Sequence, residues 1–254
     1  LFSFVMRQDL QSRSVQQQTR QEAIAFLEKN GVAVDESIIP KSAALQPQQV
    51  ERDREREPEL AQALLGSQVE ERSLGGEVYR YHNQKGYIQF HADGTFQGEF
   101  VSGAFPLEGE NPREYSVKIL ERLDFRGEIL SVSGEEDGAA ETTVILRQTW
   151  NGIPLFDRQV TLTYRGGDLV SMSGGRRLNG TPQEDESRQP MQVPTALLRF
   201  YHGLTSMGDV CSRIDSITQG YVGTNYSPAP PRWSLCGKLP PTRAPTCWIC
   251  SPGR

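Results

Sequence analysis

The most constraining feature of the sequence is a series of apolar–polar alternations between Glu128 and Ser173, divided at short intervals by turn residues. The alternating segments are Glu128–Ser133, Thr142–Trp150, Gln159–Tyr164 and Leu169–Ser173, and the turns are Glu135–Gly138, Asn151-Gly152 and Gly166-Gly167. Alternation with a period of two predicts half-buried strands, and Asn-Gly and Gly-Gly predict tight turns. This stretch therefore predicts an antiparallel meander. Pro154 lies in the crossing segment Ile153–Asp157 and indicates an edge or a bulge.

A second group of strands precedes this meander. The pattern predicts strands at Glu77–His82, Tyr87–Ala92 and Thr95–Val101, with a hairpin at Asp93-Gly94. These strands carry most of the alternating aromatic residues, namely Tyr79, Tyr81, Tyr87, Phe90, Phe96 and Phe100. Packing in a core or on a sheet face explains most of them, and an exposed subset would mark a protein-binding face.

Helical periodicity alternates with these strands. The first predicted helix is Ser14–Asn30, with a Thr19-x-x-Glu22 capping box and a stop at Gly31. A short helix through Leu60, Ala63, Leu64 and Leu65 ends at Gly66. Two further helices are predicted, Asn111–Leu123, with Asn111 as N-cap and Pro112 at the first helical position, and Pro194–Leu204. A strand is predicted at Cys211–Val222. The seven residues Glu51–Glu57 are charged throughout, which favours a solvated helix face or a linker.

The order helix, strands, helix, strands, helix, strand predicts an α+β protein with two helix-on-antiparallel-sheet units. We place a juxtamembrane segment at residues 1–13, an N-terminal α+β unit at 14–108 and a C-terminal α+β unit at 109–225. Residues 226–254 form a tail rich in Pro and Cys. The chain of 254 residues is long enough for two modest domains or one large one.

The sequence offers little for catalysis. A net charge of −5 gives no basic field for a nucleic-acid backbone, and the three histidines share no spacing. His82, His91 and His202 are therefore expected to be surface or packing residues. Gly-x-Ser-x-Gly and P-loop motifs are absent from the sequence, so we predict a non-enzyme without catalytic, cofactor-binding or metal-binding residues. The Cys247-Trp-Ile-Cys250 pair lies in a proline-rich context that disfavours a zinc or redox site.

Both ends of the chain are unusual. Leu1–Met6 is apolar and turns polar at Arg7-Gln8-Asp9, which is typical of a frayed terminus or of the tail of a membrane helix. Hydrophobic periodicity stops at Tyr226. A shifted reading frame over Pro241–Arg254 permits Asp-Thr-Gly-Ser-Tyr-Leu-Leu-Asp-Leu-Leu-Thr-Gly, an alternating strand followed by a turn. We hypothesise a frameshift between Tyr226 and Trp233, which a DNA read with one intact frame would reject.

Several blocks together resemble the YycI branch of the YycH/YycI family. They are the apolar start running into Arg7-Gln8-Asp9, the segment Ala25–Val34, the block Trp150–Asp157 with Val160, Leu162, Tyr164, Gly167 and Leu169, the segment Thr195–Phe200, and the strand Ile214–Tyr221. Within them we single out Trp150, Asn151, Gly152, Pro154, Phe156 and Tyr164 as a candidate structural motif. Family members end in a Trp-containing strand, an Asp-Thr-Gly-x-Tyr strand and a Thr-Gly turn, and this ending is missing as the sequence is written.

The resemblance implies an extracytoplasmic α+β body on a single membrane helix. It implies an accessory regulator of a sensor histidine kinase, in a bacterial two-component system that controls cell-wall metabolism. The implied partners are that kinase, a related regulator and the membrane, and the implied mode is protein–protein contact without nucleic acid or cofactor. The segment Asn151–Asp157 is also similar to PepSY propeptide domains, so a protease-inhibitory or peptide-binding module is the alternative.

Overall fold

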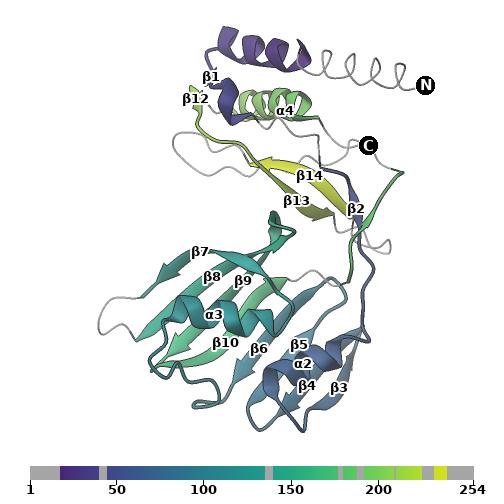
Figure 1. The fold of residues 1–254 in the computed structure, drawn as a ribbon, viewed down its shortest axis with the longest axis vertical. Coiled ribbons are helices and arrows are strands. Elements are labelled where there is room, and N and C mark those ends of the chain that lie inside the picture. The colour runs from purple at the N-terminus through teal and green to yellow at the C-terminus, as the bar shows by residue number, and fades with distance from the viewer. Residues whose placement is uncertain are drawn as a thin grey trace, which may run out of the picture. The chain divides into compact units, whose positions relative to one another are not determined.

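A computed structural model describes residues 18–39, 45–134, 140–176, 180–187, 192–208, 210–224 and 232–238, with the backbone alone for Arg176, Thr224 and 232–238. Its helices are 18–29, α2 (Glu57–Leu65), α3 (Pro112–Glu121) and α4 (Val193–Ser206), with a 3-10 turn η1 (Glu36–Ile38) (Figure 1). Its strands are β1 (Ala33–Val34), β2 (Gln48–Gln49), β3 (Glu70–Gly75), β4 (Val78–Asn83), β5 (Gly86–Phe90), β6 (Thr95–Phe100), β7 (Gly127–Ser133), β8 (Glu141–Trp150), β9 (Ile153–Arg165), β10 (Asp168–Arg176), β11 (Gln183–Glu184), β12 (Arg213–Ile214), β13 (Thr218–Thr224) and β14 (Arg232–Lys238). The predicted α+β class, with helices on an antiparallel sheet, is confirmed.

The chain divides into two compact units. The larger unit holds Gln48–Glu184 and Tyr221–Trp233, and the smaller holds Leu1–Pro47, Asp185–Gly220 and Ser234–Arg254. This division differs from the boundary that we placed between residues 108 and 109. The physical reason is that β6 pairs with β10, so strands from both predicted units belong to one sheet.

The larger unit is built on a sheet with the order β3-β4-β5-β6-β10-β9-β8-β7, in which every neighbouring pair is antiparallel. The amino-terminal part of β9 has β13 as a further neighbour, because Leu155 pairs with Tyr221 of β13 in parallel register. Helices α2 and α3 lie on the same face of the main sheet (Figure 1).

One helix followed by four antiparallel strands occurs twice in this unit, as α2 with β3–β6 and as α3 with β7–β10. The two halves meet through their last strands. When the turn glycines Gly94 and Gly167 are aligned, Gly98 corresponds to Ser171 and Glu99 to Met172. These four residues form the pairs Ser171↔Glu99 and Met172↔Gly98, which exchange under that correspondence. A local two-fold axis therefore passes between the pairs, which explains why both helices cover one face.

The helix-covered face contains the core of the larger unit. Its two helices contribute Leu60, Ala61, Leu64, Leu65, Ile119 and Leu120, and its strands contribute Tyr81, Ile88, Phe90, Phe96, Val144, Leu146, Leu162 and Leu169 among others. Ala63, on the same helix α2, is exposed, whereas Ala61 is buried. Asn111 caps α3 as predicted, since its side-chain oxygen accepts a hydrogen bond of 2.8 Å from the Arg113 amide.

The smaller unit repeats a shorter scheme, in which a helix leads into a two-residue strand. Helix 18–29 leads to β1 and α4 leads to β12, and the two strands pair in parallel. The predicted stop at Gly31 is confirmed: φ is +81°, and the amides of Gly31 and Val32 donate to the carbonyls of Glu28 and Leu27, the bonds of a Schellman cap. Leu27, Leu197, Phe200 and Ile214 belong to its core.

The structure departs from the predicted elements at five places. Ile153–Asp157 does not cross over but begins the single strand β9, and the predicted strand Cys211–Val222 is divided into β12 and β13. Strand β3 escaped prediction because all six of its residues are exposed and give no alternation. Strand β11 lies where we expected only a linker, and strand β14 lies in the segment that we expected to be a tail.

Candidate interaction site

The six motif residues lie on the β8–β9 hairpin, but they divide between its tip and its core. Asn151 and Gly152 form the tip, with φ of +50° and +77°, the conformation of a type I′ hairpin turn. Trp150 pairs with Ile153 across the turn. The bulge predicted from Pro154 is confirmed, because the register shifts between Arg147 and Thr149, opposite that proline. Trp150 and Pro154 are both partly exposed.

Phe156 and Tyr164 lie further along β9. Phe156 is 7% exposed, and the Arg147 guanidinium lies 5.1 Å from the centre of its ring. Tyr164 is in the core beneath α3, where its hydroxyl is 2.6 Å from the Ser116 hydroxyl. Burial raises the pKa of Tyr164 well above its usual value, and the hydrogen bond with Ser116 acts in the opposite direction. Tyr164 thus stabilises the fold, and among the six motif residues it is those at the hairpin tip, Trp150 to Pro154, that are at least partly exposed.

Strand β13 packs against the first half of β9. The ring of Tyr221 lies 5.9 Å from that of Trp150, and its backbone pairs with Leu155. Burial raises the pKa of Tyr221, while a hydrogen bond with Gln48 lowers it. A Cβ at Gly223 would come within 2.9 Å of the Arg158 guanidinium, a side chain that is only 2% exposed. A side chain at position 223 would therefore have to displace the Arg158 guanidinium.

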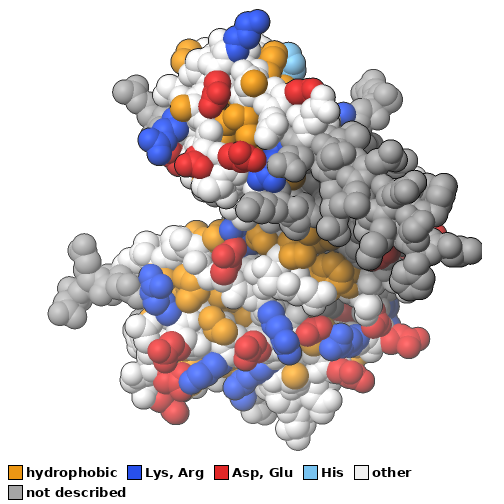
Figure 2. Space-filling model, turned by 45° about the horizontal axis from the view of Figure 1, so that its top comes forward, with side chains coloured by type: hydrophobic (Ala, Val, Ile, Leu, Met, Phe, Trp, Pro, Cys, Tyr) orange, Lys and Arg blue, Asp and Glu red, His pale blue; other side chains and the backbone are white. Residues whose placement is uncertain are grey.

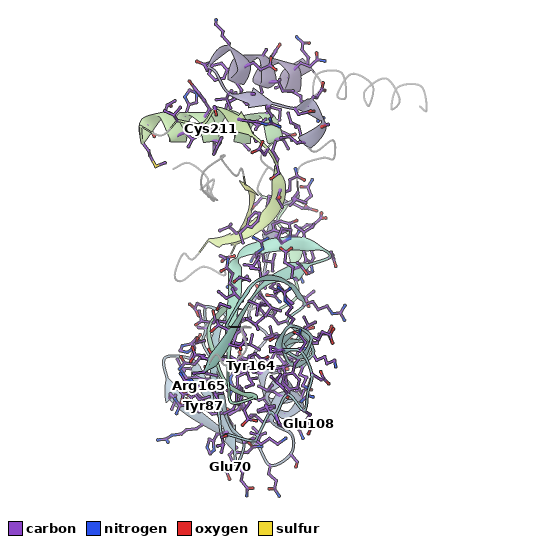
Figure 3. All side chains as sticks on the ribbon, turned by 90° about the vertical axis from the view of Figure 1, so that its left-hand side faces the viewer. Glu70, Tyr87, Glu108, Tyr164, Arg165 and Cys211 are labelled. Atoms are coloured by element: carbon purple, nitrogen blue, oxygen red, sulfur yellow. The ribbon has the colours of Figure 1, made fainter. Side chains whose placement is uncertain are left out.

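The second face of the main sheet is polar and partly exposed. Cross-strand pairs put side chains on the same face, and the pairs that alternate with the core pairs contain mainly Ser, Thr, Gln and charged residues. They include Glu70, Arg72, Arg80, His82, Tyr87, Gln97, Glu99, Ser131, Ser133, Thr143, Thr161, Thr163 and Ser171, each exposed or half-buried. We call this surface the polar face. In Figure 3 the sheet is seen nearly edge-on, and Tyr87 and Glu108 are labelled on opposite sides of it.

Arg80 is held rigidly on the polar face. Its Nε and Nη2 both donate to Oε1 of Gln89, at 3.0 and 2.9 Å, and its guanidinium lies 4.2 Å from the centre of the Tyr87 ring. Gln89 is only 5% exposed, and its Nε2 lies 3.0 Å from Nε2 of His91. Of the aromatic residues singled out in the sequence, Tyr87 is the one on this face, while Tyr81, Phe90, Phe96 and Phe100 are buried.

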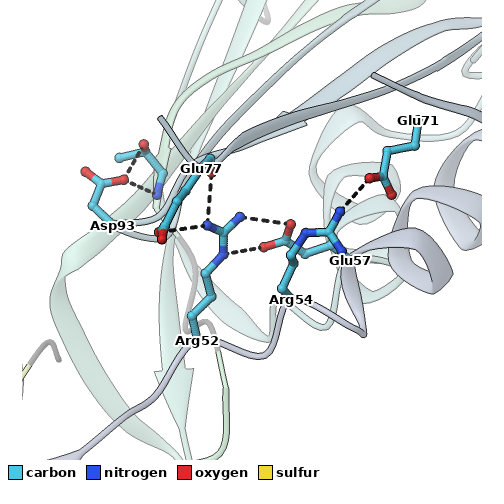
Figure 4. A network of polar contacts seen from close by, with 7 residues as sticks. Arg52, Arg54, Glu57, Glu71, Glu77 and Asp93 are labelled. Carbon is cyan, nitrogen blue, oxygen red and sulfur yellow. Dashed lines mark hydrogen bonds and ion pairs between the residues drawn. The ribbon is translucent and has the colours of Figure 1, made fainter. Parts of the chain in front are cut away.

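A charged network borders the other side of β3 and β4 (Figure 4). Arg52 binds Glu57 through two hydrogen bonds of 3.0 Å and donates a third, of 2.9 Å, to the Glu77 carbonyl. Arg54 contacts Glu71 at 2.5 Å and lies 3.8 Å from the centre of the Tyr79 ring. The predicted solvated face is therefore wrong for Glu57, which is fully buried because Arg52 folds back over the start of α2.

Charges of both signs are interspersed over the face of the molecule that Figure 2 presents. The histidines lie apart: His82 is 4.0 Å from Glu70, His91 contacts Gln89, and His202 packs near the rings of Phe26 and Tyr201. The part of the chain that the structure describes contains no group of His, Cys, Asp and Glu suited to a metal ion. Cys247 and Cys250 lie outside that part.

The chain matches no family model and no curated protein. A crystal structure of an uncharacterized protein from Eubacterium rectale is 10% identical over 85% of both chains, with a TM-score of 0.46. The C-terminal domain of Bacillus megaterium YpeB is 11% identical over 76% of this chain and 88% of that domain, with a TM-score of 0.39. At these identities and TM-scores we infer neither family nor function from either structure.

Residues 1–13, where the sequence predicts the end of a membrane helix, fall outside the residues described. Among the helices that the structure does describe, none has the length and apolar character needed to cross a bilayer.

Proposed function

We propose that this chain is the extracytoplasmic part of a membrane-anchored accessory regulator of a sensor histidine kinase. In this proposal it belongs to the YycH/YycI family, catalyses no reaction and acts in a bacterial two-component system that controls cell-wall metabolism. Its partners are the kinase and a related regulator, and a helix upstream of Leu1 holds it in the membrane. The sequence blocks that resemble the YycI branch supply the name of the partner.

The observation that carries the proposal is the polar face of the main sheet. Antiparallel sheets that pack helices on one side expose the other side to solvent or to a partner. Here the exposed side presents hydroxyl and amide groups together with a preorganised arginine, Arg80, on the ring of Tyr87. Interfaces of non-obligate complexes have this mixed character, with aromatic and arginine residues enriched. A contact surface of this kind supports the proposal that the protein acts by binding another protein.

Site-specific photo-crosslinking in living cells tests the proposal. A photoreactive residue replaces Thr161 on the polar face, in the complete protein with its natural upstream segment. The matched control replaces Glu114, an exposed residue of α3 on the helix-covered face. We expect an adduct with the sensor kinase from position 161 and a much weaker one from position 114.

Two outcomes would contradict the proposal. If both positions give the same adducts, the polar face is not the contact surface. If position 161 captures a secreted protease and the purified chain inhibits that protease, the PepSY-like alternative replaces the kinase.

A further inference from the structure

We propose that Asn151 is a site of spontaneous deamidation, by which the chain modifies the tip of its own β8–β9 hairpin without an enzyme. The backbone nitrogen of Gly152 attacks the side-chain carboxamide carbon of Asn151. A five-membered succinimide ring forms, and the amide group leaves as ammonia together with the proton of the Gly152 nitrogen. Water then opens the ring at either carbonyl, which gives aspartate or isoaspartate at position 151. The inference is independent of the proposed function, because the reaction requires no partner.

The sequence contains three Asn-Gly pairs, namely Asn30-Gly31, Asn151-Gly152 and Asn179-Gly180. A following glycine favours the reaction, because it has no side chain to hinder the approach of its own nitrogen. Asn179 lies outside the described residues. The structure therefore compares the pair at the hairpin tip with the pair that ends helix 18–29. All four residues of these two pairs are exposed, so access of water does not distinguish them.

The pair at the end of helix 18–29 is held by hydrogen bonds. Nδ2 of Asn30 donates to the Phe26 carbonyl at 2.7 Å, which fixes the side chain that would be attacked. The Gly31 amide donates to the Glu28 carbonyl at 3.0 Å, which engages the nitrogen that would attack. Both bonds belong to the end of the helix and have to break before the succinimide can form.

At the hairpin tip the two reacting groups are free. No described residue is hydrogen-bonded to the Asn151 side chain or to the Gly152 amide. The last cross-strand pair is Trp150 with Ile153, so the peptide that joins Asn151 to Gly152 lies beyond the ladder. This central peptide can rotate without breaking a hydrogen bond.

Rotation of the central peptide brings the reacting atoms together. Attack requires the Gly152 nitrogen to lie on the side of the Asn151 side chain, and a ψ of about −120°, the value at the first central residue of a type II′ turn, places it there. Types I′ and II′ both join strands through two residues, so the hairpin keeps its register. Gly152 then changes the sign of φ from +77°, which glycine does freely. Because asparagine disfavours the type II′ position, the turn adopts it only briefly and the reaction is slow.

The two products change the tip differently. Aspartate keeps the backbone and adds a negative charge to it. Isoaspartate inserts one additional carbon atom into the backbone, so the two-residue turn no longer fits between Trp150 and Ile153. The ring of Trp150 lies 5.9 Å from that of Tyr221, so this product should loosen the contact between the tip and β13.

Peptide mapping of the purified, complete chain tests the inference. The folded chain is incubated at mildly alkaline pH, digested with trypsin at intervals and analysed by mass spectrometry. Cleavage after Lys29, Arg147 and Arg158 places Asn30 and Asn151 in different peptides. We expect Asn151 to convert at least about tenfold faster than Asn30, because two hydrogen bonds have to break first at Asn30. Labelling by an isoaspartate-specific methyltransferase should follow the conversion.

Two controls separate the effect of the structure from that of the sequence. In urea, where the helix and the hairpin are both unfolded, Asn30 and Asn151 should convert at similar rates. Asn151→Asp suits the same turn, since Asp-Gly also forms type I′ turns, and it has no ammonia to release. The mass increase should then disappear from the peptide that holds position 151, while the slow increase at Asn30 remains.

The inference is overturned if Asn30 converts as fast as Asn151 in the folded chain, or if Asn151 stays intact there while both convert in urea. It is also overturned if Asn151 keeps its full advantage in urea, because the neighbouring sequence rather than the turn then sets the rate. The photo-crosslink from position 161 tests the proposed function separately, so either proposal can fail while the other holds.

Discussion

Removal of the Arg52 guanidinium should destabilise the larger unit strongly, because it leaves the Glu57 carboxylate buried without its main partner. The Glu57 side chain is 0% exposed, that of Arg52 is 15% exposed, and two hydrogen bonds of 3.0 Å join them. Breaking a buried ion pair on one side costs about 3–5 kcal/mol. Because Arg52 keeps some contact with water, we expect Arg52→Met to lower the free energy of unfolding by about 3 kcal/mol.

The matched control is Arg56→Met. Arg56 pairs with Asp124 at 3.0 Å, but the two side chains are 51% and 46% exposed, so its loss should cost at most about 1 kcal/mol. The double variant Arg52→Met/Glu57→Leu removes both charges and should recover most of the lost stability. The unfolding by urea is monitored through the hydrogen exchange of the amides of Ile88 and its neighbours in β5, so that the measurement reports on the larger unit alone. Equal losses for Arg52→Met and Arg56→Met, or no recovery in the double variant, would show that the burial of the Arg52–Glu57 pair does not set the cost of breaking it.

Three further predictions concern the larger unit. Burial raises the pKa of Tyr164 above its unfolded value near 10, so stability is full below pH 10 and falls as the pH rises beyond it. Tyr164→Phe should lower the free energy of unfolding at neutral pH by about 1–3 kcal/mol, because Ser116 loses its hydrogen-bond partner. The same variant should lose less stability than the parent as the pH rises above 10, which urea titrations at several pH values measure. Gly152→Val should cost at least about 1 kcal/mol, because φ is +77° there, and a thermal melt that matches the parent would contradict this. Leu120 is buried in the core, so Leu120→Ala should lower the free energy of unfolding by about 2–5 kcal/mol. Leu130 is 41% exposed, so Leu130→Ala should lower it by under about 1 kcal/mol, and urea titration measures both values.

Local sequence patterns predicted the turns, the helix ends and those strands that have one apolar and one polar face. The hairpin at Asn151-Gly152, the cap at Asn111 and the stop at Gly31 follow from backbone chemistry within a few residues, and the structure contains all three. The antiparallel meander followed from alternation in the same way. These features need no information from distant parts of the chain.

Long-range features escaped prediction because no local pattern carries them. The pairing of β6 with β10 joins segments on either side of α3, and only the folded sheet reveals the symmetry between the two halves. The burial of Glu57 depends on a guanidinium that turns back from Arg52, so a charged run looked solvated. The polar face could not be assembled from the sequence, since its residues come from separate strands whose register is set by the turns.

We propose that this chain regulates a sensor kinase by direct contact outside the cytoplasm. The most direct measurement is the crosslink from a photoreactive residue at position 161 of the complete, membrane-inserted protein, identified by mass spectrometry. The proposed function predicts a sensor histidine kinase as the main adduct, weak or absent when the photoreactive residue replaces Glu114. An adduct with a secreted protease, or identical adducts from both positions, would contradict it.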